Sequence, residues 1–403
     1  MAAYLGMAAR GSGVTTALRD VYQHRLYVPA HLRIYLEDTF HVRRSGASTR
    51  ESLNAAMQWL VHAQDVAGAG VAAYYSFANG WSAPYAETTG YIICTMFDFY
   101  QLTKLDVYRD RAVRMSDWEL EMQLPEGAFP GGHSGPSARP IVFNTGQVLQ
   151  GLVRAYIETK DEKYERAARK AGDWLADIQE PDGSWLKHTY RSRVHTYHTR
   201  VAWPLYELYQ ITKDDRHARA AERNLRWALR NQQPNGWFKD NALYLQTEDA
   251  LTHSIAYAIE GLLEAGILSG HKDFIAAARK ASDVVLEIFQ TDGWLQASYD
   301  STWKSRDRYS CVTGNAQMSI VWLRLFELTN EERYAQAALE MNATIKTIQD
   351  TRSRHPGIKG GIKGSDPIYG GYMPMCYLNW ATKFFADALI LETRLRPAMA
   401  LAS

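Results

Sequence analysis

The chain alternates between two apolar patterns, and each pattern predicts a different kind of helix. Before Gln179 the apolar positions follow the spacing i, i+4, i+7, i+11 and i+14, which is one stripe on an α-helix. These positions are Tyr164, Ala168, Ala171, Leu175 and Ile178. The opposite face is charged, which is typical of an outer helix. Residues 145–157 are apolar over most of the helical circumference, which predicts an inner helix packed on several sides.

A glutamine closes the outer pattern at a nearly constant interval. Six such glutamines recur every 53 to 59 residues, at Gln64, Gln123, Gln179, Gln232, Gln290 and Gln349. Four of them lead into a turn of glycine and an aromatic residue, as in QEPDGSW, because glycine permits the backbone conformation in which a helix ends. We expect the aromatic side chain to pack first of all as a plug on the helix ends, at Phe129, Trp185, Phe238 and Trp294.

The inner helices are expected to open at a threonine, 20 to 25 residues after each of the first five glutamines. These threonines are Thr89, Thr145, Thr199, Thr252 and Thr313, and the sixth inner helix departs from the rule near Leu378. Strict alternation of six outer and six inner helices predicts an all-α fold, an (α/α)6 toroid of six helical hairpins. The predicted pairs are 51–64 with 87–103, 107–123 with 144–158, 162–179 with 197–211, 215–232 with 249–265, 273–290 with 312–328, and 332–349 with 376–393. Residues 1–50 are predicted to form an N-terminal arm, and residues 51–403 the toroidal catalytic domain.

The two kinds of connection are unequal in length, and this inequality predicts where a site lies. Turns from inner to outer helices have only a few residues, whereas connections from outer to inner helices are long and rich in Gly, Trp and Tyr. Long loops on a rigid ring commonly carry function. On that end the starts of the six inner helices converge, so we expect their first-turn side chains to line a central funnel. Aromatic rings there suit sugar rings, and interleaved bases such as Arg191, Arg193 and Lys239 favour an acidic sugar.

Acidic and imidazole side chains at the starts of inner helices are the candidate catalytic residues. Glycosidic chemistry needs a proton donor and a carboxylate on opposite sides of a sugar. Glu87 opens the first inner helix, and Glu248 or Asp249 opens the fourth, which lies opposite in a six-membered ring. Hydrolysis by these carboxylates is the favoured reaction. Proton abstraction by His198 and His253, as in a lyase or an epimerase, is the alternative.

Polar and aromatic residues of the same segments are the candidate substrate ligands. They are Trp81, Tyr85, Asn144, Gln147, Tyr197, Arg200, Tyr244, Asn315, Gln317, Tyr377, Asn379 and Trp380. Each residue also has a structural interpretation, because first-turn acids suit the helix dipole and buried histidines usually have a structural partner. The sequence therefore predicts the region of the site more firmly than the role of any one side chain.

Composition excludes several classes of partner. The chain has 45 basic and 44 acidic residues, so nucleic acid is not an expected partner. No apolar run is long enough to span a bilayer, and three widely spaced cysteines without a CxxC motif argue against disulfides and structural zinc. We therefore expect a cytoplasmic protein that binds an oligosaccharide or polysaccharide. No compact metal motif, Walker loop or dinucleotide fingerprint is present, so neither a metal nor a cofactor is predicted, and the oligomeric state stays open.

The repeat resembles the six-hairpin toroids of carbohydrate-active enzymes, chiefly in FNTGQVLQGLVRAYIETKDEKYERAARKAGDWL. That group includes unsaturated-glucuronyl hydrolases, toroidal polysaccharide lyases, glucuronyl epimerases and N-acylglucosamine 2-epimerases. The resemblance covers roughly residues 50–395 and implies a site in the funnel. The segments PYAETTGYI and GGYMP also look like those of bacterial proteins associated with polysaccharide clusters. The aspartate pair of the glucuronyl hydrolases has no clear equivalent in this chain.

Two further interpretations come from the same pattern. The segment WLADIQEPDGSW, with Gln179, Gly183 and Trp185, is similar to the repeat of triterpene cyclases. A terpene-cyclase-like toroid would need an acidic DxDD or DDxxD cluster, and the sequence has neither. A non-catalytic glycan-binding toroid would keep the aromatic residues without a coupled acid and base.

Overall fold

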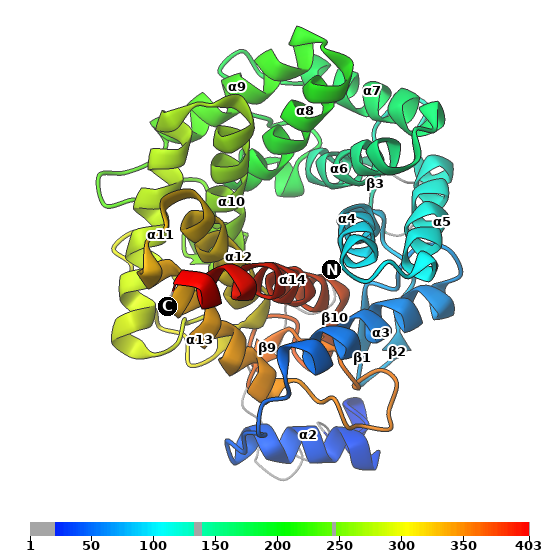
Figure 1. Cartoon of the computed structure of the whole chain (residues 1–403), viewed down its shortest axis with the longest axis vertical. Coiled ribbons are helices and arrows are strands. Elements are labelled where there is room, and N and C mark those ends of the chain that lie inside the picture. The colour runs from blue at the N-terminus through cyan, green and yellow to red at the C-terminus, as the bar shows by residue number, and fades with distance from the viewer. Residues whose placement is uncertain (1–20, 133–138, 244–246, 403) are drawn as a thin grey trace.

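In a computed structural model of the protein, residues 21–402 are described except for 133–138 and 244–246. Six helix pairs form a closed ring (Figure 1). The outer helices are α3 (Thr49–Ala67), α5 (Asp106–Met122), α7 (Glu162–Asp177), α9 (Asp215–Arg230), α11 (Lys272–Asp292) and α13 (Glu332–Ile348). The inner helices are α4 (Ala86–Thr103), α6 (Val142–Thr159), α8 (Thr199–Thr212), α10 (Thr252–Ser269), α12 (Val312–Thr329) and α14 (Asn379–Ala402).

Each inner helix packs on the next one, and α14 packs on α4 to close the ring. The predicted (α/α)6 toroid is therefore confirmed. Thr89 and Thr145, however, lie inside α4 and α6 rather than at their first residues. Their hydroxyls accept hydrogen bonds from the backbone N–H groups of Val71 (3.0 Å) and Phe129 (2.9 Å). These threonines fasten the incoming connection to the helix instead of capping the helix itself.

The repeating glutamines join neighbouring outer helices. Gln123 Nε2 donates to the carbonyl oxygen of Gly127 in its own turn (2.9 Å) and to that of Ala167 in the next outer helix (2.9 Å). Equivalent pairs of bonds are made by Gln64, Gln179, Gln232 and Gln349. Gln349 reaches the Ser52 carbonyl of α3, so it ties the last outer helix to the first. Gln290 is exposed and departs from the pattern. The motif shared with cyclase repeats is thus explained by ring architecture.

The aromatic residues after the turn glycines are mostly packing plugs, as expected. Phe129 and Trp185 are fully buried, and Phe238 is nearly so. The Trp185 indole also donates to the Leu175 carbonyl (2.9 Å), which fixes the turn on its own helix. Trp294 is 37% exposed, while the next residue, Leu295, fills the buried position.

Short strands join the long connections to one another. A four-stranded sheet has the order β2 (Gly80–Trp81), β1 (Tyr74–Ser76), β10 (Cys376–Leu378), β8 (Ile362–Lys363). Two-stranded pairs link β3 (Pro130–Gly131) with β4 (Arg139–Pro140), β5 (Ala250–Leu251) with β6 (Ser298–Tyr299), and β7 (Ser310–Cys311) with β9 (Ser365–Asp366). Two single turns of 3-10 helix, Tyr190–Ser192 and Thr196–His198, precede α8. Because strands of different connections pair, the long connections meet at one end of the ring.

Helix α2 (Pro29–Thr39) lies outside the ring, against the connection between α13 and α14 (Figure 1). The buried Asp38 carboxylate pairs with Lys363 Nζ (2.5 Å) and accepts the backbone N–H of Ile368 (2.6 Å). The Tyr75 hydroxyl lies between His31 Nε2 (2.9 Å) and His355 Nε2 (3.1 Å). A buried ion pair and a hydrogen-bond chain therefore attach α2 to the toroid.

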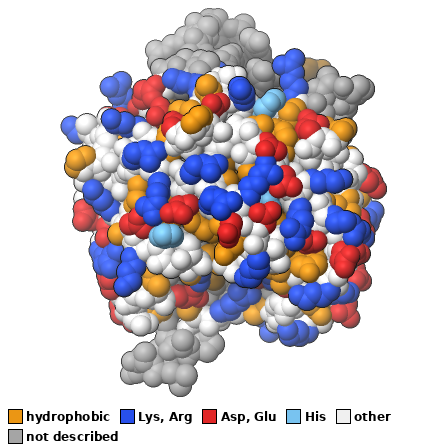
Figure 2. All heavy atoms as spheres, turned by 90° about the horizontal axis from the view of Figure 1, so that it is seen from above, with side chains coloured by type: hydrophobic (Ala, Val, Ile, Leu, Met, Phe, Trp, Pro, Cys, Tyr) orange, Lys and Arg blue, Asp and Glu red, His pale blue; other side chains and the backbone are white. Residues whose placement is uncertain are grey.

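The surface fits the balanced composition of the chain. Figure 2 shows Lys and Arg side chains interspersed with Asp and Glu side chains on one side of the ring. Within the described residues, no helix combines the length and the apolar character that crossing a bilayer requires.

Candidate functional site

Glu87 is the acidic residue at the centre of the candidate site. It lies in the first turn of α4 and is only partly buried. Burial raises the pKa of the Glu87 carboxyl to about 7, although the hydrogen bond from the Tyr85 hydroxyl to Oε2 (2.9 Å) acts in the opposite direction. A carboxyl with this pKa is present in both protonation states near neutral pH, as a general acid or base requires.

The charge of Glu87 acts on a tyrosine of the same helix, Tyr91, and on tyrosines of two further segments, Tyr197 and Tyr257. Burial raises the pKa of Tyr91, Tyr197 and Tyr257 well above the usual value, and the charge of Glu87 adds to the rise in each case. Asn144 from the first turn of α6 donates to the Tyr85 hydroxyl oxygen (3.1 Å). We call this set, with His253, Tyr372 and Trp380, the central cluster.

His253 extends the central cluster along α10. Its ring lies 4.3 Å from that of Tyr257, one helical turn further on, and 5.9 Å from that of Tyr372. Its Nδ1 bonds to the Gln317 amide oxygen (2.5 Å), so Nδ1 carries hydrogen and Nε2 is the basic nitrogen. Burial, with a smaller contribution from the charge of Arg200, lowers the pKa of His253 to about 4, although the hydrogen bond with Gln317 acts in the opposite direction. His253 is therefore neutral at pH 7.

A buried layer of charges lies beneath the central cluster. Arg200, only 1% exposed, pairs with Glu260 (3.3 Å), and its guanidinium lies 5.8 Å from the Tyr257 ring centre. Lys383 pairs with Asp387 (2.7 Å) and lies 5.1 Å from the Tyr91 ring centre. Because it is enclosed and paired, Arg200 fits a structural role better than the predicted role of substrate ligand.

The two carboxylates predicted to work with Glu87 have different environments. Glu248 is exposed, and its carboxylate lies 3.5 Å from Arg193 in a surface ion pair. Asp249 is partly buried just before β5, and its backbone N–H donates to Thr247 Oγ1 (2.9 Å). Among the described residues, neither carboxylate contributes to the pKa shift of Glu87. Of these three carboxyl groups, Glu87 is the one whose charge acts on Tyr91, Tyr197 and Tyr257.

His198 is sealed inside the protein. The side chain is fully buried between the rings of Trp185 (6.0 Å) and Tyr197 (5.1 Å), and neither ring nitrogen has a partner among the described residues. Burial lowers its pKa well below the usual value. A group without access does not fit the predicted catalytic role.

Several predicted substrate ligands have structural partners, and Asn379 donates to one of them, the Thr88 hydroxyl, directly beside Glu87 (2.8 Å). Trp81 packs on Trp59 and His62 of the outer helix α3, at 5.0 and 5.4 Å between ring centres. Asn379 donates to the Ala72 carbonyl (3.0 Å), and Gln147 to the Arg200 carbonyl (3.2 Å). Tyr377 is buried in strand β10.

The other predicted ligands lie nearer the centre, with one exception. Trp380 donates to the Tyr372 hydroxyl (3.0 Å), and the buried Asn315 is two residues from Gln317 on α12. Tyr244 lies outside the described residues.

The candidate residues from the sequence lacked Tyr91, Tyr257 and Tyr372, and Tyr372 was expected only as one of the aromatic residues of the long connections. Tyr91 follows Glu87, and Tyr257 follows His253, by four residues on an inner helix, so each pair shares a helical face. Extending the search by one turn from each candidate would have found both tyrosines. Tyr372 comes from the long connection before α14, where no helical spacing applies.

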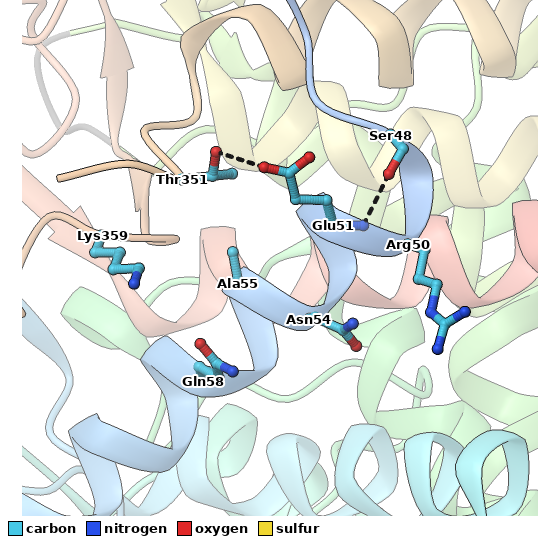
Figure 3. A pocket seen from close by; sticks show the side chains of 8 residues that line it. All are labelled: Ser48, Arg50, Glu51, Asn54, Ala55, Gln58, Thr351 and Lys359. Atoms are coloured by element: carbon cyan, nitrogen blue, oxygen red, sulfur yellow. Dashed lines mark hydrogen bonds between the residues drawn. The ribbon is translucent and has the colours of Figure 1, made fainter.

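Two other places in the described structure have features of a binding site. Among the described residues, Asp173, Asp214 and His217 form a group with metal-ligand atoms, between α7 and α9. His217 and Arg216 already bond to Asp173 (3.1 and 3.2 Å), and Asp214 caps α9, so the group is explained without an ion. A pocket of about 370 Å³ lies outside the ring, between α3 and the connection after α13 (Figure 3). It is lined by Ser48, Arg50, Glu51, Asn54, Ala55, Gln58, Thr351 and Lys359.

Three solved structures that match this chain are enzymes that act on sugars. An unsaturated glucuronyl hydrolase from Bacillus sp. GL1 matches with a TM-score of 0.68 and 17% identity, over 87% of this chain and 97% of that one. A cellobiose 2-epimerase from Bacillus thermoamylovorans matches with a TM-score of 0.70 and 11% identity, over 86% and 98%. An unsaturated glucuronyl hydrolase from Streptococcus agalactiae, complexed with dGlcA-GalNAc6S, matches with a TM-score of 0.62 and 13% identity, over 85% and 91%.

No protein-family model and no curated protein sequence matches the chain. At these identities the structural similarity establishes the fold, and the activity has to be argued from the site.

Proposed function

We propose that this protein is an enzyme that acts on an oligosaccharide or polysaccharide and cleaves a glycosidic bond with Glu87 as the proton donor. The observation that carries the proposal is the partly exposed Glu87 carboxyl, with a pKa of about 7, among tyrosines at the starts of the inner helices. A neutral carboxyl near pH 7 can protonate a leaving oxygen. The tyrosine rings and Trp380 supply the flat apolar faces that stack on sugars.

Hydrolysis also needs a group that activates water or attacks the sugar. Of the two predicted partners, Asp249 is the better candidate, because the Glu248 side chain is exposed and pairs with Arg193. The fold similarity to glucuronyl hydrolases supports this reaction class. An acidic substrate stays part of the proposal, with exposed bases such as Arg193 as its candidate partners.

Epimerisation is the second candidate, and His253 is the observation that favours it. Its Nε2 is the basic nitrogen, its ring lies 4.3 Å from that of Tyr257, and the charge of Glu87 acts on the same tyrosine. An acid and a base on the same side of the site can remove the proton from the carbon next to a carbonyl group of a sugar and return it. The same fold supports a cellobiose 2-epimerase.

The test is a panel of neutral and uronic-acid oligosaccharides. New reducing ends without ultraviolet absorbance indicate hydrolysis, an absorbing unsaturated product indicates a lyase, and solvent deuterium in an uncleaved sugar indicates an epimerase. Glu87→Gln should abolish the reaction, and His253→Asn should abolish deuterium exchange only in the epimerase case. Sugar binding without turnover of any substrate would favour a glycan-binding protein.

A cytoplasmic location is also proposed, supported by three cysteines that form no disulfide.

A further inference from the structure

One backbone carbonyl fixes the orientation of the Asn144 amide beside Tyr85. Asn144 Nδ2 donates to the Pro130 carbonyl oxygen (2.9 Å). A carbonyl oxygen can only accept, so the amide group must present its nitrogen on this side. The orientation of the Asn144 amide is therefore fixed by its surroundings.

The Pro130 carbonyl is itself held in place. The neighbouring N–H of Phe129 donates to Thr145 Oγ1 (2.9 Å), so α6 binds this segment through two consecutive first-turn residues. Gly131 allows the segment to approach, because a Cβ atom there would lie 2.3 Å from Ile141 Cγ1. The start of the chain of hydrogen bonds is thus a rigid point of the fold.

The polarity then passes to Glu87. The second hydrogen of Asn144 Nδ2 points to the Tyr85 hydroxyl oxygen (3.1 Å), which accepts it. The hydroxyl hydrogen of Tyr85 is left for Glu87 Oε2 (2.9 Å). An oxygen that accepts this bond is not the one that carries the acidic proton. Glu87 Oε1 makes no hydrogen bond to the described residues and is not an enclosed atom.

We propose that Asn144 and Tyr85 are positioning residues that direct the acidic proton of Glu87 onto Oε1, the oxygen that makes no hydrogen bond to the described residues. This inference rests on the proposed role of Glu87 as the proton donor. It assigns to Asn144 and Tyr85 an indirect role instead of the substrate contact that the sequence predicts. The two hydrogen bonds, from Asn144 to Tyr85 and from Tyr85 to Glu87, therefore place the acidic proton on the oxygen of the carboxyl that a substrate can reach.

The test measures the pKa of Glu87 itself, by infrared or carbon-13 NMR titration, with Glu87→Gln identifying the signal. Tyr85→Phe removes the donor to the carboxylate, so the pKa should rise by about one pH unit. Tyr197→Phe is the matched control, because Tyr197 lies within the influence of Glu87 but its hydroxyl makes no hydrogen bond to it. This control should not raise the pKa.

Asn144→Leu should raise the Glu87 pKa by a smaller amount, and this effect should vanish when Tyr85 is already Phe, because Asn144 acts through Tyr85. The positioning role would be overturned if the Glu87 pKa is unchanged in Tyr85→Phe, or if it rises equally in Tyr197→Phe. Additive effects of Tyr85→Phe and Asn144→Leu on this pKa would also overturn it. Full activity of Glu87→Gln would instead refute the proposed function, and the titration would still decide the positioning role.

Discussion

The carboxyl groups of Glu87 and Glu119 both lack a salt bridge among the described residues, and they differ in access. Glu87, at the start of the inner helix α4, receives a hydrogen bond from Tyr85 and stays partly exposed. Glu119, near the end of the outer helix α5, is fully buried, and neither carboxyl oxygen has a partner among the described residues. Burial raises the pKa of both groups. A raised pKa alone therefore does not mark a catalytic group; access and a directed partner do.

The largest expected effect separates the two groups by activity. Glu87→Gln should lower kcat/KM by about 10²- to 10⁴-fold, the usual contribution of a general acid, because the amide has no proton to give. Glu119→Met should retain activity. The contrast between Glu87 and Glu119 is contradicted if both variants lose activity equally, or if circular dichroism shows that the Glu87 variant is unfolded.

The pH dependence sharpens the same contrast. The proton donor is the protonated form of Glu87, whose pKa is raised to about 7, so activity should be present below pH 7 and fall above it. The fall approaches tenfold per pH unit in kcat/KM. In Glu119→Met the fall of kcat/KM should occur over the same pH range as in the wild-type protein. A shift of this range in Glu119→Met would contradict the assignment of Glu87 as the proton donor.

Stability should show the opposite ranking. Glu119→Met removes a sealed carboxyl, so it should raise the free energy of unfolding by about 1–3 kcal/mol at pH 7. The pKa of Glu119 in the folded protein is raised, so the wild-type protein loses stability as pH rises above 4.5. The stability gained by Glu119→Met should therefore become smaller as pH is lowered from 7 to 4.5. The control is Glu121→Met, at an exposed position of α5, which should have little effect in urea unfolding.

A buried cluster with complete partners provides the smallest expected effect. Tyr75→Phe breaks the bonds to His31 and His355, so it should lower the free energy of unfolding by about 1–2 kcal/mol without changing kcat. Burial lowers the pKa of His31 to about 4, so the wild-type protein should lose stability as pH falls from 6.5 toward 4. Unfolding curves at several pH values check both points.

The sequence predicted the ring and the region of the site better than the depth of each side chain. The period of the glutamines and the apolar stripes indicate which face of a helix is buried. The predicted helix boundaries therefore lie within a few residues of those in the structure. The same periodicity does not report how far a first-turn residue lies from the axis. Arg200 and His198 were therefore predicted at the site although they are sealed, and Trp81 was predicted there although it packs on α3. Tyr372 comes from a connection without periodicity, and only the fold places it beside His253.

The most direct test of the account is a crystal structure of Glu87→Gln with a bound oligosaccharide. We predict that a sugar will stack on the central cluster, with a glycosidic oxygen within hydrogen-bond distance of the side chain at position 87. A sugar bound only elsewhere, for example in the pocket between α3 and the connection after α13, would contradict the assignment of Glu87 as the proton donor.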